Sequence, residues 1–440
     1  MPETVLRINS FPSELLSAIL TAAYNCYAAS VDFGFGHLTR YPILLSSICS
    51  YWRQVALETP PLWATVDIKS IEQAQVYFRR SGTSVLRVRL AGTAYCTEDA
   101  PPVDPKVPSS AAKNLLLAHA PRMQALVVNL TQLGDETTAF MELLACLSEH
   151  TLQELGIYKD WRSSRVSEPL TDEKLSRVLG QLRFFHLEAF QIHLSDIGCH
   201  NLTELFIAYP EGPLSSANIA RLLRSNPGLS TITLFGLKSV DLSPDNTEPI
   251  RLPELRRFHI DGYAERIIPW LLDVLVPGSH GISLHLDSIS PLYNQPRVLL
   301  NSLVRFFQKA SITSLNLEIA ELPIPQMLES LPDLQHLQLT SYTLDYPDIF
   351  LYMMDPAVEK ITKLRTIDLY KCEFQDYNRV SPGLQKLLNV PSLEEIRIFR
   401  CGGDNPENGS KLQKLLADNT AARVTEYPEL EVQLRPYLFQ

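Results

Sequence analysis

The chain has no apolar stretch long enough to cross a bilayer. The best run, residues 267–276, is broken by Pro269 and Asp273, whereas a membrane-spanning helix needs about 20 mostly apolar residues. Near the amino terminus Arg7 and Glu14 interrupt the apolar segment, which is atypical of a secretory signal. The sequence therefore predicts neither a membrane partner nor a secretory route.

The chain also has no excess of positive charge. Its 39 lysines and arginines are outnumbered by 49 aspartates and glutamates, which gives a formal net charge of −10. A surface that binds phosphates normally needs a surplus of lysine and arginine. We therefore expect no nucleic-acid partner.

Paired cysteines are missing as well. The seven cysteines are scattered, odd in number and never spaced as Cys-x-x-Cys. This usage is typical of reduced thiols inside the cell, and we expect the protein in the cytoplasm and/or the nucleus.

The common catalytic signatures are absent too. There is no Gly-x-Ser-x-Gly, no Gly-x-x-x-x-Gly-Lys loop and no His-Glu-x-x-His. The segment with His193, Asp196, Cys199 and His200 has metal-ligand residue types, but it lacks the paired short spacing of zinc sites. We therefore predict no enzyme, no cofactor and no metal. An enzyme whose site is assembled from distant loops is an alternative that this pattern leaves open.

What the chain does have is a repeat. The pattern apolar-x-x-apolar-x-apolar recurs about every 28 residues between residues 85 and 393, with a degraded copy at Leu284 and Leu286. The intact copies begin at Val85, Met123, Leu152, Leu182, Leu202, Leu229, Leu255, Ile312, Leu334, Leu364 and Leu393. Helical apolar spacing occurs between several copies, for example in residues 298–307. Each unit is thus expected to be one strand followed by a helical or irregular return.

This pattern resembles the leucine-rich-repeat family over roughly residues 80–402. Cys372 and Cys401 stand where such repeats place Asn or Cys in the turn after the strand. The resemblance implies an α/β fold, namely a curved solenoid with a parallel β-sheet on its concave face. An unrelated α/β domain whose strands share a spacing is the alternative.

Residues between the apolar positions of each strand point to the opposite face of the sheet. Mixed charges and aromatic side chains there suit recognition of a target protein, although a solvated face without a partner is the plainer alternative. The candidate target-binding residues are Arg257, His259, Asp261, His336, Gln338, Asp368, Tyr370, Glu395, Arg397 and Phe399.

Three segments near the amino terminus form a second pattern. They read Phe11-Pro-Ser-Glu-Leu-Leu-Ser-Ala-Ile-Leu20, then Leu44-Leu-Ser-Ser-Ile-Cys-Ser-Tyr-Trp-Arg53, then Thr59-Pro-Pro-Leu-Trp63. Proline in the first turn and helical apolar spacing predict two short amphipathic helices. Two such helices cannot bury both apolar faces on each other, so something else must cover them.

These segments resemble an F-box in its fungal form, with Phe11 at the usual leucine position and an insert from about Asn25 to Tyr41. The resemblance implies docking onto the Skp-type adaptor of a cullin ubiquitin ligase. The residues at the family's adaptor-facing positions are Pro12, Glu14, Leu15, Leu16, Ile19, Leu45, Ile48, Cys49, Trp52 and Arg53.

Together the two resemblances predict a helical F-box-like domain over residues 1–70. A leucine-rich-repeat solenoid with a carboxyl-terminal cap follows over residues 71–440. The implied function is substrate recognition in a Skp–cullin–F-box type E3 ubiquitin ligase, with the adaptor, through it a cullin, and an unknown target as partners. The alternative is a non-catalytic interaction scaffold whose F-box-like helices only cap the solenoid.

Overall fold

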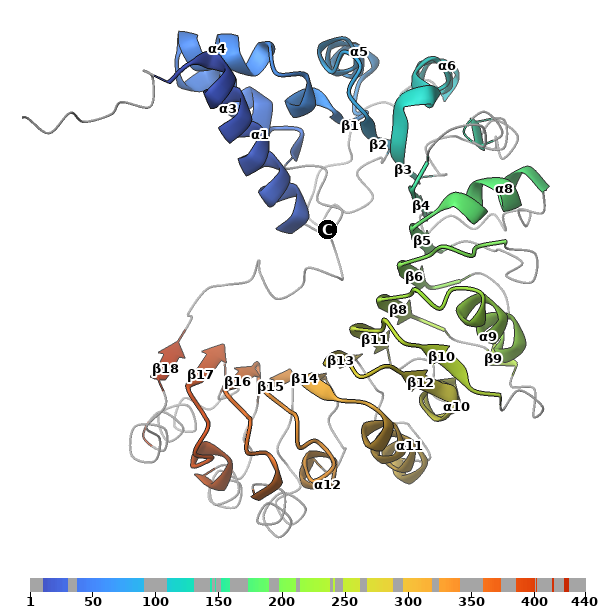
Figure 1. Ribbon diagram of the computed structural model, residues 1–440, viewed down its shortest axis with the longest axis vertical. Coiled ribbons are helices and arrows are strands. Elements are labelled where there is room, and N and C mark those ends of the chain that lie inside the picture. Colours follow the sequence, from blue (N-terminus) through green and yellow to red (C-terminus); the bar gives the residue numbers. More distant parts are fainter. Residues whose placement is uncertain are drawn as a thin grey trace, which may run out of the picture. The chain divides into compact units, whose positions relative to one another are not determined.

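The computed structural model describes residues 11–30, 38–90, 109–129, 143–144, 147, 152–158, 173–189, 198–210, 214–237, 240–241, 248–261, 267–287, 296–318, 324–340, 359–372, 385–399, 401, 414 and 423–426 (Figure 1). These fall into two compact units, one up to Cys199 and one that begins at His200. Three further segments lie wholly or mostly outside the described residues. They are 99–108, whose prolines indicate a loop, 138–147, whose apolar spacing indicates a helix, and 412–418, where the carboxyl-terminal cap is expected.

The first unit begins with helices and continues as strands alternating with helices. Its helices are α1 (Ser13–Ser30), α3 (Tyr41–Ile48), α4 (Ser50–Leu57), η2 (Pro60–Trp63), α5 (Ile71–Arg80), α6 (Ser109–His119), η3 (Ala120–Arg122) and α8 (Glu173–Gln181). Its strands are β1 (Thr65–Asp67), β2 (Leu86–Leu90), β3 (Met123–Asn129), β4 (Glu154–Tyr158) and β5 (Phe184–Glu188). The five strands lie side by side in chain order, all parallel.

The second unit repeats this arrangement. Its main strands are β6 (Glu204–Ala208), β8 (Thr231–Phe235), β11 (Arg257–Asp261), β13 (Ile282–Asp287), β14 (Ile312–Leu317), β15 (His336–Thr340), β16 (Thr366–Tyr370), β17 (Glu395–Phe399) and β18 (Arg423–Glu426). Its described helices are α9 (Ser216–Arg224), α10 (Ile267–Val274), α11 (Pro296–Lys309) and α12 (Ile324–Leu328). Two small parallel pairs are added, β7 (Leu214–Ser215) with β9 (Val240–Asp241) and β10 (Ile250–Leu252) with β12 (Leu275–Pro277).

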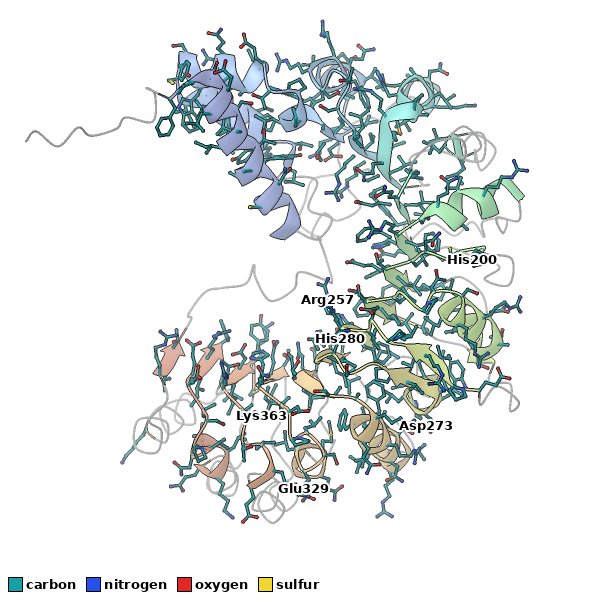
Figure 2. All side chains as sticks on the ribbon, viewed as in Figure 1. His200, Arg257, Asp273, His280, Glu329 and Lys363 are labelled. Carbon is teal, nitrogen blue, oxygen red and sulfur yellow. The ribbon has the colours of Figure 1, made fainter. Side chains whose placement is uncertain are left out.

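In the second unit the main strands follow the inner side of a curve, and α9 to α12 lie on its outer side (Figure 1). Figure 2 shows the same division in labelled side chains, with Arg257 on the strand side and Asp273 and Glu329 on the helix side. The main strands are parallel and adjacent in chain order. The predicted α/β class and repeat architecture are confirmed.

The sheet register explains why the repeat positions are apolar. Val88 on β2 lies opposite Leu126 on β3, which lies opposite Leu155 on β4 and then Phe185 on β5. All four side chains are buried. Because each strand adds its apolar residue to the same ladder, stacked units bury a core that no single unit encloses.

The turns after the strands use a recurring backbone conformation. Ala189, Tyr209, Gly236 and Lys371 each follow the last residue of a strand with φ between 47° and 57°. Non-glycine residues rarely adopt this left-handed conformation, so the repeat imposes it. The predicted turn cysteines lie in the same region, where the Cys372 thiol donates to the Leu339 carbonyl at 3.4 Å and the Cys401 thiol to the Leu369 carbonyl at 3.3 Å.

Six strands were not anticipated. Four of them form the small pairs β7 with β9 and β10 with β12. β1 precedes the first predicted repeat, and β18 adds a strand beyond the last, pairing with β17 through Ile396 and Val424. The predicted domain boundary near residue 70 stays a prediction. None of the described helices combines the length and the apolar character that a bilayer span requires.

Candidate docking surfaces

The helices at the start of the first unit are positioned by local sequence signals. Pro42 lies in the first turn of α3, where its fixed φ favours helix initiation. Cys49 has extended backbone, so it ends α3 and caps α4 by accepting a hydrogen bond from the Trp52 backbone N–H at 3.4 Å. Cys49, predicted to face an adaptor, thus has a structural task.

One face of these helices is buried against the start of the repeat sheet. On α1 the side chains of Leu16, Leu20 and Tyr24 are buried, and the Tyr24 hydroxyl donates to Oγ1 of Thr65 on β1. The Trp63 indole N–H donates to the Ala56 carbonyl at 2.7 Å, which ties η2 to α4. This packing holds α1, α4 and η2 to the first strand.

The other face leaves apolar side chains in solvent. On α1, Leu15 and Ile19 are 48% and 40% exposed, and on α3, Ile43, Leu44 and Ile48 are 49%, 62% and 58% exposed. Residues four apart lie on one helix face, so Leu15 with Ile19 and Leu44 with Ile48 each form a stripe. We call these four residues, together with the neighbouring Ile43, the apolar stripes.

The predicted adaptor-facing residues therefore divide between the two faces. Pro12, Glu14, Leu15, Ile19, Ile48 and Arg53 are exposed, Cys49 and Trp52 are partly exposed, and Leu16 and Leu45 are buried. Leu16 and Leu45 are buried and pack the helices together, and a contact of either residue with an adaptor stays a prediction. Ile43 and Leu44 were missed, although an apolar run of three residues in a short helix cannot be buried on one face.

The second candidate surface is the sheet face of the second unit. The predicted target-binding residues alternate with buried apolar residues along their strands, so they lie on the face opposite the helices. The register gives the rows of neighbours. Gln338, Asp368 and Arg397 lie opposite one another on three adjacent strands, as do Thr340, Tyr370 and Phe399.

Polar groups at the carboxyl-terminal end of this sheet form a charge network. His336 Nε2 lies 3.6 Å from Asp368 Oδ2, and Arg397 Nη1 lies 3.6 Å from the same oxygen. Arg397 Nη2 and Arg423 Nη2 pair with Glu395 at 3.0 and 2.8 Å. The structure thus brings together four of the predicted residues, each held by an oppositely charged or polar neighbour.

Burial sets the protonation of this network. Burial raises the pKa of Asp368 above its ordinary value, although His336 and Arg397 oppose the shift. Burial also lowers the pKa of His336, against the opposing effect of Asp368. Burial thus disfavours the protonated form of His336, and Arg397 and Arg423 are the cations that lie against the carboxylates.

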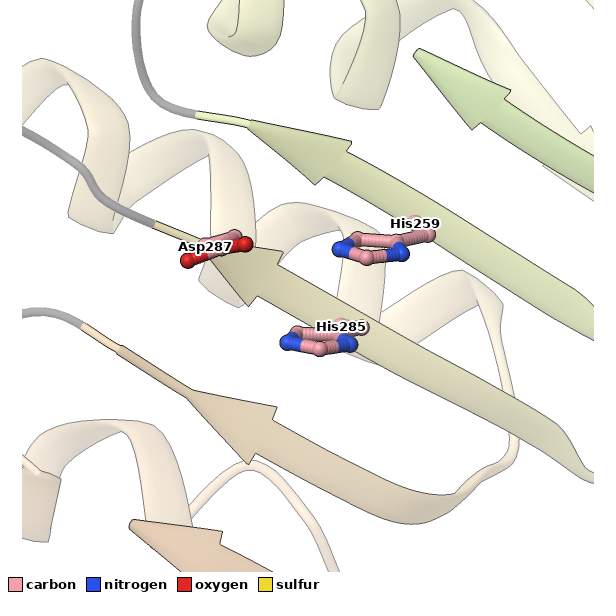
Figure 3. Close-up of side chains that lie close together, drawn as sticks. All are labelled: His259, His285 and Asp287. Atoms are coloured by element: carbon pink, nitrogen blue, oxygen red, sulfur yellow. The ribbon is translucent and has the colours of Figure 1, made fainter. Parts of the chain in front are cut away.

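A second group on the same face lies nearer the middle of the sheet. The His259 and His285 rings stack at a centroid distance of 3.8 Å with 3° between their planes. Figure 3 shows the two rings on neighbouring strands, with Asp287 at the end of the strand that carries His285. His259, Asp261 and Asp287 are buried and His285 is partly exposed. Their nitrogens and carboxylate oxygens are of the type that binds metal ions.

The earlier candidate for a metal segment gains no support. Burial raises the pKa of the Cys199 thiol to about 12, so the thiolate that a metal needs is disfavoured. His200 is exposed, and His193 and Asp196 lie outside the described residues.

Comparison with known proteins adds little to these surfaces. No protein-family model matches the chain, and no curated protein matches it in sequence. Among solved structures, the crystal structure of the yeast Rad7 and Elc1 complex contains a similar chain, with 15% identity and a TM-score of 0.37. The similarity covers 89% of this chain and 90% of that chain, and at this level it carries no argument about function.

Proposed function

We propose that this chain is the substrate-recognition subunit of a Skp–cullin–F-box type E3 ubiquitin ligase. In this proposal the apolar stripes dock onto the Skp-type adaptor, and the sheet face of the second unit holds the target protein. The chain positions the target protein and contributes no group that makes or breaks a covalent bond. Ubiquitin transfer is faster because the target lysine is held at high effective concentration.

The observation that carries the proposal is the exposure of the apolar stripes. Monomeric soluble proteins scatter exposed apolar residues singly, whereas grouped ones mark interaction sites. Fully burying a Leu or Ile side chain is worth about 1.5–3 kcal/mol, so covering five half-exposed ones contributes on the order of 4–7 kcal/mol. Association itself costs about 4–15 kcal/mol, so polar contacts, for example from exposed Glu14 and Arg53, are needed as well.

The packing of the helices also favours a second role. Buried Leu16, Leu20 and Tyr24 and the bond from Tyr24 to Thr65 cover the first strand of the sheet. Repeat arrays need such a cap because their terminal units otherwise expose core. A helix that caps with one face can dock with the other, so the experiment must separate the two roles.

The decisive experiment is co-purification of the full chain with a recombinant Skp-type adaptor. The variant Leu44→Asp with Ile48→Asp puts two carboxylates into the proposed interface while leaving the buried face intact. We expect the affinity for the adaptor to fall more than about 100-fold, because burying two unpaired carboxylates in an interface is strongly unfavourable.

The matched controls are Val85→Asp and Val298→Asp, which alter valines that are 54% and 43% exposed and lie outside the stripes. Both should bind the adaptor as the unaltered chain does. Equal binding by the double variant, with an unchanged melting temperature, would refute the docking surface. Failure of the unaltered chain to bind any adaptor would leave only the capping role.

A further inference from the structure

Four ligand-type side chains lie on one face of strands β11 and β13, and three of them come close together. The register pairs His259 with His285 and Asp261 with Asp287. Residues two apart on a strand share a face, so the two imidazoles and the two carboxylates lie on the same side of the sheet. One ligand atom each of His259, His285 and Asp287 lies within 4.8 Å of the other two.

The surroundings disfavour a positive charge on either imidazole. Burial lowers the pKa of His259 well below its usual value, and the neighbouring His285 lowers it further. Burial lowers the pKa of His285 to about 4, although Asp287 opposes this shift.

We propose that His259, His285 and Asp287 form a binding site for one divalent transition-metal ion of the Zn²⁺ type. Two imidazoles and one carboxylate are a donor set that such ions take, with the remaining position left to water or another ligand. Asp261, opposite Asp287 on the neighbouring strand, adds a second carboxylate to the same face of the sheet. Partly exposed His285 gives the ion its route from solvent.

Binding requires a small rearrangement of side chains. The parallel rings direct their nitrogen lone pairs side by side rather than toward one point. Ligand atoms around a tetrahedral Zn²⁺ at about 2.0–2.2 Å lie roughly 3.3 Å apart. To bind the ion, the rings must therefore open from the stack and the carboxylate must approach them, through rotation about the side-chain torsions of these residues.

The ion would bridge two adjacent repeats on the face that carries the predicted target-binding residues. His259 and Asp261 are two of those residues. In this proposal they belong to a site that links neighbouring repeats rather than to a surface that contacts the target. This inference does not depend on the proposed ligase function. It concerns only groups within the second unit.

The test is calorimetric titration of Zn²⁺ alone into the full chain after removal of metals with a chelator. We compare the unaltered chain with His285→Ala and with the near-isosteric Asp287→Asn. The control is His280→Ala, which alters an exposed histidine that pairs with Glu254 at 3.5 Å. Titration with Co²⁺, followed by its visible absorption, reports the coordination sphere separately.

We expect one saturable Zn²⁺ equivalent in the unaltered chain and in His280→Ala, and binding at least about tenfold weaker in both cluster variants. Zn²⁺ should raise the melting temperature of the unaltered chain and not that of His285→Ala. If His285→Ala does not fold, Asp287→Asn decides. Equal affinity in the folded cluster variants, or no saturable binding of either ion, overturns the proposal.

Discussion

Replacement of Asn226 by alanine tests how the repeats are joined in the second unit. Asn226 is fully buried just after α9. Its Oδ1 accepts a hydrogen bond from the Leu202 backbone N–H at 2.9 Å, and its Nδ2 donates to the Leu222 carbonyl at 2.7 Å. One amide group thus links its own helix to the chain segment before the neighbouring strand β6.

The expected cost follows from the groups left behind. Asn226→Ala leaves a buried N–H and a buried carbonyl without this partner, and each such group costs about 1–3 kcal/mol. We therefore expect a loss of about 2–4 kcal/mol in the free energy of unfolding. For a unit of this size that lowers the melting temperature by roughly 4–16 °C.

The assay is thermal unfolding followed by circular dichroism, with urea unfolding as a second measure. Asn389→Ala is the matched control, because this asparagine is exposed and is bonded through its backbone N–H. It should change the melting temperature by about 1 °C or less. Equal melting temperatures for Asn226→Ala and Asn389→Ala would refute the reasoning that this amide bridge stabilises the unit.

Two further predictions concern the turn at Gly236 and the buried side chains of Tyr158 and Cys199. Gly236→Ala should destabilise the second unit by more than about 1–2 kcal/mol, because φ is +57° and the new Cβ would lie 2.1 Å from Cδ1 of Tyr209. Adding Tyr209→Ala should recover part of that loss in the double variant. Full stability of Gly236→Ala alone would contradict the clash. Burial raises the pKa of Tyr158 and of Cys199 to about 12 each, so these groups stabilise the fold below their ordinary pKa values. That stability should be lost progressively as the pH rises from about 9 toward 12. At pH 8 iodoacetamide should modify exposed Cys26 and spare Cys199, and rapid alkylation of both in the folded chain would contradict this assignment.

The repeat strands were predictable because their signal is local and recurs. Each copy of the apolar spacing marks the same inward positions, apart from the exposed Val85 at the start of the first copy. Every predicted copy corresponds to a strand of the structure. The degraded copy at Leu284 and Leu286 corresponds to β13. Apart from the two small strand pairs, β1 and β18 were not predicted, because terminal strands have only one neighbour and need less of the repeat pattern.

The helical surface was predicted only in part. Apolar spacing shows which residues of a helix share a face, but it does not show which face meets the next element. Leu16 and Leu45 proved to be buried, whereas Ile43 and Leu44 are exposed. The side of each helix that remains in solvent depends on how α1, α3 and α4 pack, and that packing involves residues distant in sequence such as Thr65.

The histidine cluster was outside the reach of sequence reasoning for a related reason. His259 and Asp261 were singled out as parts of a binding face, but His285 and Asp287 belong to the degraded repeat and carried no signal. In the sequence, α10 and β12 separate His259 and Asp261 from His285 and Asp287. Only the pairing of β11 with β13 places the four side chains together.

The sequence by itself determined the repeating parallel sheet, because stacked units of about 28 residues must bury their apolar positions on one another. It also determined that short amphipathic helices begin the chain, through their proline and apolar spacing. Only the tertiary structure decided which apolar side chains stay in solvent and which polar side chains become neighbours. Those outcomes depend on strand register and helix packing, which join residues far apart in the chain and leave no local pattern to read.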